Sequence, residues 1–280
     1  MKAVTKSDNI MLMDAYRKAN RKMWDEFAVI NSRSAFYHVG EFKQGRSSLE
    51  PLILSEMGEV RGKTLLHLQC HFGLDTLSWA REGAQVTGMD FSPEGIRIAR
   101  GLAEELNIPA RFICCDLYDL PEYLDETFDR AYTSYGVLCW LPDIPRWAQI
   151  VGHFLKPGGI FYFAEFHPFS NVFKNDGDET GLEAAYPYFT NQPLEFPVEG
   201  SYADPEAKTV QQVEYEWSPR MGEIITGLID AGLRIEFVRE YPFTCYRHFA
   251  FLVEKEPGKW FLPDGMPSIP LTLTLRAHKE

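Results

Sequence analysis

The stretch TLLHLQCHFGLDTLSWAREGAQVTGMD, residues 64–90, decides the fold class. Its first residues, 64–69, are an apolar run typical of a buried strand, and residues 85–90 form a second such run. Between them, residues 74–82 have the composition and length of a helix. Two strands joined by a helix form a unit in which the strands lie parallel in one sheet. The stretch therefore predicts an α/β fold.

The same alternation continues toward the C-terminus. Further helices are expected at 92–107, 144–155 and 221–233, and further strands at 110–116, 128–135, 160–166, 234–242 and 270–277. Alternating strands and helices indicate a mostly parallel sheet with helices on both faces. In such sheets the ligand binds beyond the carboxyl ends of the strands, so the residues that follow each strand are candidates for a site.

The chain has 280 residues, which is more than one such sheet requires. We expect an N-terminal helical cover at 1–61, a core formed by 62–166 and 219–280, and an inserted lid at 167–218. The lid stretch is rich in proline and aromatic residues and breaks the alternation of strands and helices. A loop of this length usually has a function, although a surface excursion without one is the alternative.

The chain is acidic, with 28 Lys and Arg against 40 Asp and Glu and a formal net charge of −12. Residues 174–216 alone contain ten acidic and two basic residues. This balance argues against binding of nucleic acid or of an anionic membrane surface, because both need Lys and Arg. A local basic patch is still compatible with it.

Five cysteines occur without the spacing of a disulfide framework or a zinc site. The N-terminal residues lack an apolar signal core, and no apolar run is long enough to span a bilayer. We therefore expect a reducing, cytoplasmic compartment. A hydrophobic content of 45% with 24% charged residues is that of an ordinary globular protein.

Polar residues follow three of the expected strands. The turn 69–73 leads from a strand into a helix, and Asp90 and Asp116 follow the next two strands. Helix N-terminal amides favour a carboxylate or phosphate, and an acidic side chain after the second strand can accept from a ribose diol. A carboxylate after the third strand can accept from an exocyclic amine such as that of adenine. Together they indicate a ligand that contains a nucleoside.

Four runs carry a resemblance to a known family: 65–100 (LLHLQCHFGLDTLSWAREGAQVTGMDFSPEGIRIAR), 111–121 (RFICCDLYDLP), 128–144 (FDRAYTSYGVLCWLPDI) and 153–166 (HFLKPGGIFYFAEF). Their order and spacing resemble the class I S-adenosylmethionine-dependent methyltransferases. The resemblance implies a Rossmann-like, seven-stranded, mostly parallel sheet whose last strand is antiparallel. It also implies S-adenosyl-L-methionine as the cofactor and S-adenosyl-L-homocysteine as the product.

The resemblance assigns roles to the residues after the first two strands. Gly73 would let the backbone approach the methionine part of the cofactor. Asp90 would bind the ribose hydroxyls, with Phe91 and Ser92 beside the adenosine.

The resemblance also assigns roles to the residues after the third and fourth strands. Asp116 would hold the adenine amine, with Leu117 against the ring. Ser134 and Tyr135 would face the methionine moiety and the substrate.

Aromatic residues of the N-terminal cover are further candidates for the cofactor site. Helices at this position often cover the cofactor in the family, so Trp24 and Tyr37 are expected to shield the sulfonium through cation–π contacts. Plain packing of an added helix is an equal alternative.

The first motif departs from the family pattern. His67 stands where the family usually has an acidic residue, and Gln69 and His71 stand where it has glycines. Our hypothesis is that Gln69 or His71 replaces contacts that the ordinary motif makes through backbone amides. The alternative is that cofactor binding is lost. Cys70 lies beside these histidines, but no fourth metal ligand is evident, so no metal site is predicted.

Two side chains are candidates for catalysis. His167 follows the fifth strand and is expected to act as a general base, because a neutral imidazole suits that role. The alternative is a loop histidine fixed by Pro168. Tyr135 is the second candidate because it would face the substrate.

The function expected from these features is methyl transfer by in-line displacement to a small, neutral or cationic acceptor, on an O, N or C atom. A non-catalytic protein that binds S-adenosylmethionine or another nucleoside is the first alternative. An NAD-dependent oxidoreductase is less favoured, because its fingerprint needs more glycines than residues 69–73 contain. The oligomeric state is open, with a homodimer as one option.

Overall fold

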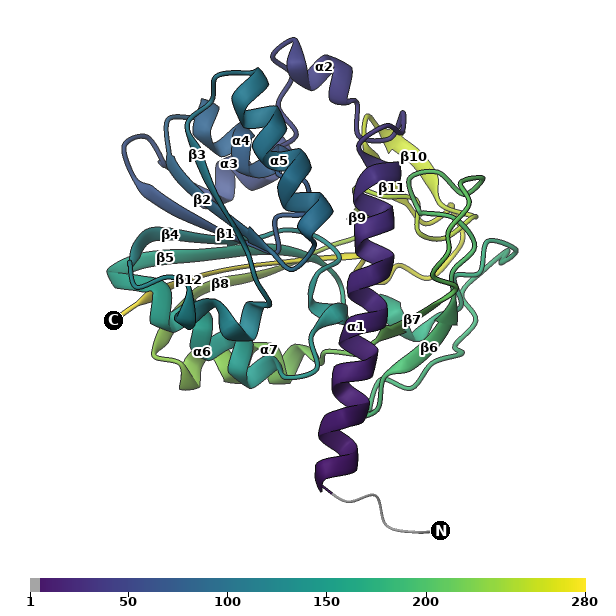
Figure 1. The fold of residues 1–280 in the computed structure, drawn as a ribbon. Coiled ribbons are helices and arrows are strands. Elements are labelled where there is room, and N and C mark those ends of the chain that lie inside the picture. Colours follow the sequence, from purple (N-terminus) through teal and green to yellow (C-terminus); the bar gives the residue numbers. More distant parts are fainter. Residues whose placement is uncertain (1–5) are drawn as a thin grey trace.

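The computed structural model describes residues 6–280 and is built on a seven-stranded sheet (Figure 1). The strand order is β3-β2-β1-β4-β5-β12-β8. The strands are β1 (Thr64–Leu68), β2 (Gln85–Asp90), β3 (Ala110–Cys114), β4 (Phe128–Thr133), β5 (Leu155–Phe166), β8 (Leu233–Tyr241) and β12 (Thr272–Lys279). Neighbours among β1–β5 are parallel, whereas β12 is antiparallel to both β5 and β8. The Rossmann-like, seven-stranded prediction with an antiparallel last strand is confirmed.

Helices cover both faces of this sheet (Figure 1). One face carries α3 (Pro51–Met57), α4 (Leu74–Arg81) and α5 (Pro93–Glu105), and the other carries α6 (Ile144–Phe154) and α7 (Met221–Asp230). The sequence starts α5 with a cap, because the Ser92 hydroxyl accepts from the Gly95 N–H and Pro93 fits the first turn. Helix α3 begins at Pro51 and is closed by Gly58, whose φ is 77°.

The core lies between the sheet and these helices. Alternate residues of β5 point to opposite faces, so Phe161 and Phe163 pack against Trp147 of α6, while Tyr162 lies with Trp79 on the other side. All five side chains are fully buried. Each such side chain contributes about 1.5–3 kcal/mol through burial, which makes the sheet a rigid platform for the residues at its edge.

Helix α1 (Lys6–Asn31) runs across the carboxyl ends of the strands and is followed by α2 (Val39–Lys43) (Figure 1). It packs on α5 and on β7 (Val213–Glu216), which pairs antiparallel with β6 (Leu194–Pro197). Asn20 fixes β7, because its Nδ2 donates to the Tyr215 carbonyl at 2.7 Å and its Oδ1 accepts from the Tyr215 N–H at 2.9 Å. The N-terminal helix and the inserted segment therefore form one layer over the sheet edge.

A second excursion lies between β8 and β12. It holds a small antiparallel sheet of β9 (Phe243–Thr244), β10 (Val253–Glu256) and β11 (Lys259–Phe261), with its own apolar cluster around Phe249 and Leu262. The sequence analysis assigned these residues to the core, because their strands are too short to show a period. Short 3-10 helices occur at η1 (Leu117–Glu122), η2 (Leu138–Trp140) and η3 (Ser170–Val172).

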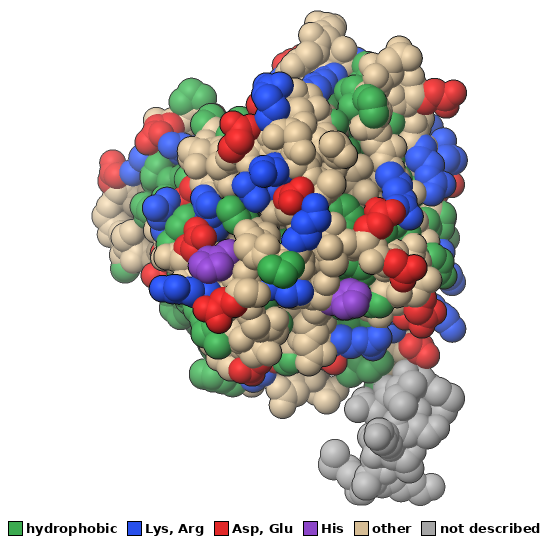
Figure 2. Space-filling view, turned by 90° about the vertical axis from the view of Figure 1, so that its left-hand side faces the viewer, with side chains coloured by type: hydrophobic (Ala, Val, Ile, Leu, Met, Phe, Trp, Pro, Cys, Tyr) green, Lys and Arg blue, Asp and Glu red, His purple; other side chains and the backbone are tan. Residues whose placement is uncertain are grey.

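The face at the amino ends of the parallel strands is mixed in charge (Figure 2). Basic and acidic side chains alternate there, and Lys156 pairs with Asp129 at 3.0 Å. Within residues 6–280, no helix has the length and apolar character that crossing a bilayer requires. All five cysteines are free thiols.

Candidate active site

Two adjoining cavities lie at the carboxyl edge of the sheet. The first, here called the inner cavity, has a volume of about 260 Å³ and is lined by the ends of β1, β2, β3 and β4 together with α1. The second, here called the outer chamber, has a volume of about 910 Å³ and is lined in large part by the inserted segment 167–218. Both are lined by Trp24, Tyr37, Tyr135 and Trp140, so these side chains form the junction between the two spaces.

The turn after β1 keeps the backbone of a glycine-rich turn although it contains only one glycine. Gln69 and His71 have φ of 58° and 51°, in the left-handed region that glycine usually occupies. A non-glycine residue there costs roughly 1–2 kcal/mol, so this turn stores strain at the site. Gly73, with φ of 85°, is required sterically, because a Cβ at this position would lie 2.8 Å from the Ala99 Cβ.

Asp90 lies at the end of β2 and is 6% exposed. Its Oδ2 accepts from the His71 N–H at 2.8 Å and its Oδ1 from the Ser92 N–H at 2.9 Å. Burial raises the pKa of Asp90 to about 7. Each carboxylate oxygen keeps a second lone pair, so Asp90 can still accept from two hydroxyls of a ribose in the inner cavity.

Besides Nε1 of Trp24, two buried polar atoms of residues that line the inner cavity have no partner in the part of the chain that the structure describes. One is Nε2 of His67, whose Nδ1 contacts Thr76 Oγ1 at 2.8 Å. The other is Oε1 of Gln69, whose Nε2 donates to the Val137 carbonyl at 3.1 Å. His67 is 1% exposed, and burial lowers its pKa to about 3, so the ring is neutral. Leaving such atoms unsatisfied costs about 1–3 kcal/mol each, which points to a polar ligand group between them.

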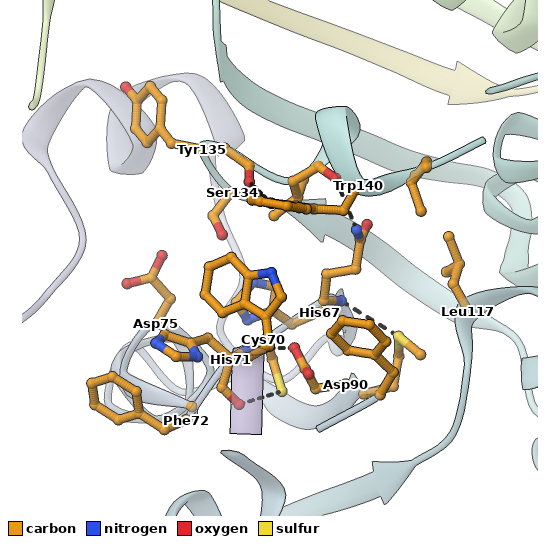
Figure 3. Close-up of a pocket in the computed structure, with 18 of the residues that line it drawn as sticks. His67, Cys70, His71, Phe72, Asp75, Asp90, Leu117, Ser134, Tyr135 and Trp140 are labelled. Atoms are coloured by element: carbon orange, nitrogen blue, oxygen red, sulfur yellow. Dashed lines mark hydrogen bonds between the residues drawn. The ribbon is translucent and has the colours of Figure 1, made fainter. Parts of the chain in front are cut away.

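His71 is part of an aromatic wall of the inner cavity (Figure 3). Its ring lies 5.1 Å from Trp24 and 4.6 Å from Phe72, measured between centroids. The Asn31 amide donates to Nε2 at 3.1 Å, which leaves the proton of the neutral imidazole on Nδ1. Burial lowers the pKa of His71 to about 3. His71 can therefore donate one hydrogen bond and carries no charge.

Asp116 lines the inner cavity but already has a basic partner. Its Oδ1 accepts from the Tyr118 N–H at 2.9 Å, and its Oδ2 accepts from Arg17 Nε at 3.1 Å. Arg17 belongs to α1 and lines the same cavity. The sequence analysis missed this arginine, because nothing in the sequence of a long polar helix indicates which charge turns inward.

Most of the other expected cofactor residues reach the inner cavity. Phe91, Leu117 and Ser134 line it together with Trp24 and Tyr37. Figure 3 places Asp90 and Leu117 toward one end of this space, and Asp75 and Ser134 toward the other. The residues to which the resemblance assigns the nucleoside and the methionine part of the cofactor thus line one cavity, and their roles stay predictions.

Ser92 does not reach either cavity. It is 1% exposed, its hydroxyl donates to Asp25 Oδ1 at 2.6 Å, and the same oxygen accepts from the Gly95 N–H at 3.0 Å. The expected place of Ser92 beside the adenosine is therefore corrected: it caps α5 and ties this helix to α1.

His167 lines neither cavity, although its neighbours Phe166 and Pro168 line the outer chamber. Its Nε2 contacts Glu240 Oε1 at 2.8 Å, its Nδ1 accepts from the Phe169 N–H at 3.1 Å, and its backbone N–H bonds to Leu271. Both ring nitrogens are thus used within the fold. This placement counts against His167 as a general base and corrects that expectation, because the chain turns toward β12 directly after β5.

Tyr135 lies at the junction and lines both spaces. Its hydroxyl donates to Glu50 Oε2 at 3.4 Å. Burial, with nearby Cys245 and Glu50, raises the pKa of Tyr135 well above its ordinary value, so the phenol stays protonated. A catalytic role for Tyr135 stays a prediction, and the structure limits it to donating a hydrogen bond.

Glu165, at the end of β5, holds the loop after β4 in place through hydrogen bonds. Its carboxylate accepts from the N–H groups of Val137 and Leu138 at 3.0 Å each, and from the N–H of Phe166 at 2.7 Å. These bonds hold the loop after β4 against the inner cavity. Of the two roles that a strand-end glutamate offers, orienting a ligand or making buried hydrogen bonds, the structure shows the second.

The inner cavity fits S-adenosylmethionine. Asp90 offers acceptors for a ribose, Phe91 and Leu117 offer apolar contacts for a purine, and His67 and Gln69 leave polar atoms for the amino-acid end. The close packing around Gly73 keeps the turn near the ligand.

Comparison with known proteins agrees with this fit. Residues 66–163 match the family model of a methyltransferase domain. The ubiquinone biosynthesis O-methyltransferases of Photorhabdus laumondii and Serratia proteamaculans are each 33% identical, over 132 and 129 residues, which is 45% of this chain and 53% of each relative. The chain therefore spans about half the length of the curated relatives that it matches.

Solved structures share the fold. The S-adenosylmethionine-dependent methyltransferase of Mesorhizobium loti superposes with a TM-score of 0.57 at 23% identity, covering 85% of this chain and 100% of that one. An S-adenosylmethionine-dependent methyltransferase of Clostridium acetobutylicum superposes with a TM-score of 0.54 at 14% identity, covering 90% of this chain and 95% of that one. Together, the comparisons show that residues 66–163 match a methyltransferase domain and that the chain shares the fold of S-adenosylmethionine-dependent methyltransferases.

Proposed function

We propose that this protein transfers the methyl group of S-adenosylmethionine to a small molecule. The observation that carries the proposal is the pair of adjoining spaces: a small cavity suited to the cofactor opens onto a larger chamber through shared aromatic walls. A protein that only binds a nucleoside needs the first space and has no use for the second. The chamber therefore favours the enzyme over the non-catalytic alternative.

The lining of the inner cavity supports an assignment of residues to the parts of the cofactor. Asp90 would accept from the ribose hydroxyls, Asp116 would accept from the adenine amine beside Arg17, and His67 and Gln69 would bind the amino-acid end. When bound, S-adenosylmethionine supplies an electrophilic methyl group on a sulfonium. The protein contributes alignment of the acceptor and exclusion of water, which is the main requirement of an in-line displacement.

The aromatic junction suits the charge of a sulfonium. Trp24 and Trp140 cross edge to face with centroids 5.4 Å apart, and Tyr37 and Tyr202 meet through their hydroxyls. Faces of such rings attract a cation by about 0.5–2 kcal/mol when water is excluded. This supports the expectation that Trp24 and Tyr37 shield the cofactor.

We further propose a neutral or cationic acceptor and a cytoplasmic protein. Acidic side chains line the outer chamber, including Glu50, Asp75, Glu214 and Glu216, and the guanidinium in its wall, Arg46, is paired with Glu41. Such a chamber disfavours polyanions, nucleic acids among them. The five free cysteines support a reducing compartment.

Thermal-shift measurements with three ligands test the proposal. S-adenosylmethionine and S-adenosylhomocysteine are expected to raise the Tm, and NAD is not, because stabilisation follows from binding to the folded state. A shift with NAD alone would contradict the proposal. Transfer of label from methyl-labelled S-adenosylmethionine into a pool of small acceptors then separates an enzyme from a binding protein, since binding without any transfer favours the latter.

A further inference from the structure

The outer chamber carries two carboxylates on one face of a strand of the inserted segment. We propose that Glu214 and Glu216 bind the amino group of an amine acceptor, so that the methylated atom is nitrogen. This inference rests on the proposed methyl transfer and narrows its substrate class. It starts from the position of the two side chains, which the sequence analysis did not single out.

The two carboxylates are held facing the chamber by the packing of β7. Residues 214 and 216 alternate with Tyr215, so they point to the side opposite to it. The Tyr215 ring packs on Tyr16 of α1 at 4.2 Å, and Asn20 holds its backbone through both hydrogen-bonding groups. Both glutamates line the chamber, and no Lys or Arg among the described residues forms an ion pair with either.

The glutamates lie close to the junction with the inner cavity. The Trp217 N–H donates to the Cys139 carbonyl at 2.7 Å, which fixes the end of β7 beside η2 and Trp140. Burial, together with the charge of Glu165, raises the pKa of Glu216, and burial with the charge of Glu216 raises the pKa of Glu214. Glu165 in turn holds the loop that borders the inner cavity. The carboxylates thus lie near the wall that separates acceptor from cofactor.

His248 is a second, independent sign of a polar ligand in the same chamber. It lines the chamber between Phe166 and Phe249, with ring centroids 5.5 Å and 4.2 Å away. Both of its ring nitrogens are buried and have no hydrogen-bond partner in the described part of the chain. Burial lowers the pKa of His248 to about 4, so the ring is neutral, with one nitrogen that donates and one that accepts. A polar group such as an amine would satisfy it, whereas an apolar acceptor would leave it unsatisfied.

The two glutamates can accept the proton that an alkylammonium must lose before its nitrogen is methylated. An alkylammonium pairs with the two carboxylates and gives one proton to one of them, which leaves a neutral amine and a carboxylic acid. The raised pKa of the glutamates favours that transfer. The nitrogen lone pair then forms a bond to the methyl carbon while the carbon–sulfur bond breaks and its electron pair stays on sulfur. The products are a methylated ammonium and the thioether S-adenosylhomocysteine.

Calorimetry with two isosteric probes tests the inference. Protein saturated with S-adenosylhomocysteine is titrated with benzylamine and with benzyl alcohol. The wild type is expected to bind benzylamine at least tenfold more tightly, and the double variant Glu214→Gln/Glu216→Gln is expected to lose that preference. The control is Glu195→Gln, an exposed acid on β6 that lines neither cavity and pairs with Tyr215; this variant is expected to keep the preference.

The outcomes separate the inference from the proposed function. Equal affinity for the two probes, no binding of benzylamine, or an amine preference that survives the double substitution would overturn the amine site. Failure of wild-type protein to bind S-adenosylhomocysteine would count against the proposed function instead. If the double variant does not bind S-adenosylhomocysteine, the affinities of wild-type protein for benzylamine and benzyl alcohol test the amine site, and equal affinities would overturn it.

Discussion

The inner cavity and the outer chamber differ in how the sequence builds them. The inner cavity uses short motifs that each follow a strand, so that Gln69, Asp90, Asp116 and Ser134 meet because parallel strands end at one edge. The outer chamber uses residues from the inserted segment and from the excursion before β12, such as Glu216 and His248. The fold therefore determines the inner cavity, whereas the insertions determine the outer chamber.

Replacing Asp90 with alanine is expected to cause the largest loss of cofactor affinity. The backbone N–H groups of His71 and Ser92 would lose their acceptor, and each buried orphan costs about 1–3 kcal/mol. With the ribose contact also lost, affinity for S-adenosylhomocysteine should fall about 100-fold or more by calorimetry. Asp119→Ala, at a carboxylate that lines neither space, is the control. An unchanged affinity in Asp90→Ala would contradict the role of this carboxylate.

Gly73→Ala is expected to destabilise the fold more than an alanine at another left-handed glycine. A Cβ at residue 73 would meet Ala99 and Phe112 at 2.8 Å and 3.0 Å, whereas Gly62, with φ of 72°, has open space. Gly62→Ala should cost about 1 kcal/mol for its backbone alone, and Gly73→Ala about 2–4 kcal/mol. Chemical denaturation measures both free energies of unfolding. Equal losses would show that the turn is not closely packed on α5.

Gln69→Gly is expected to raise the stability of the fold and to lower the affinity for S-adenosylmethionine. The left-handed backbone at this position is relaxed by glycine, which should add about 1 kcal/mol of stability despite the loss of the bond to Val137. The same change removes the free Oε1, so affinity for S-adenosylmethionine should fall about three- to tenfold. Gln69→Ala should lose affinity without gaining stability. If both variants, together with His71→Ala, keep full affinity, side chains do not replace the usual backbone contacts of this motif.

Affinity for S-adenosylhomocysteine is expected to rise with pH through about 7. Burial raises the pKa of Asp90 to about 7, so this side chain is protonated below that pH and ionised above it. The ionised carboxylate of Asp90 accepts more strongly from ribose hydroxyls than the protonated carboxyl does. Without a ligand, the folded protein favours the protonated carboxyl, so binding at low pH requires the loss of a proton. The affinity for S-adenosylhomocysteine is expected to rise a few-fold between about pH 6 and about pH 8, which lie about one unit on either side of the raised pKa. This rise should be lost in Asp90→Asn. A flat profile in wild-type protein would contradict it.

His167→Ala is expected to have the smallest effect on catalysis. Its ring bonds to Glu240 and to the N–H of Phe169 and lies outside both spaces. Turnover should stay within about twofold, while the Tm should fall because the Phe169 N–H loses its acceptor and Glu240 loses its partner. A large loss of kcat with unchanged stability would restore His167 as the base.

The sequence predicted the sheet and the inner cavity well for a physical reason. Strand and helix periods are local, and a residue directly after a parallel strand has little freedom in where it goes. Thus Asp90 and Leu117 line the inner cavity at the strand ends where a ligand was expected. Ser92 was assigned to the wrong partner because a hydroxyl before Pro93 serves as a helix cap equally well.

The outer chamber could not be predicted in the same way. Which face of β7 turns inward depends on Asn20 and on the packing of Tyr16 against Tyr215, contacts that span almost two hundred residues. The small sheet around β11 has strands of two to four residues, too short for a period to show. Long-range contacts of this kind leave no local pattern in the sequence.

A crystal structure with S-adenosylhomocysteine tests the central claim most directly. The account predicts that the ribose lies at Asp90, that the amino-acid end lies at His67 and Gln69, and that the sulfur faces the outer chamber past Trp24 and Tyr135. A ligand bound outside the inner cavity, or a sulfur that points away from the chamber, would contradict it.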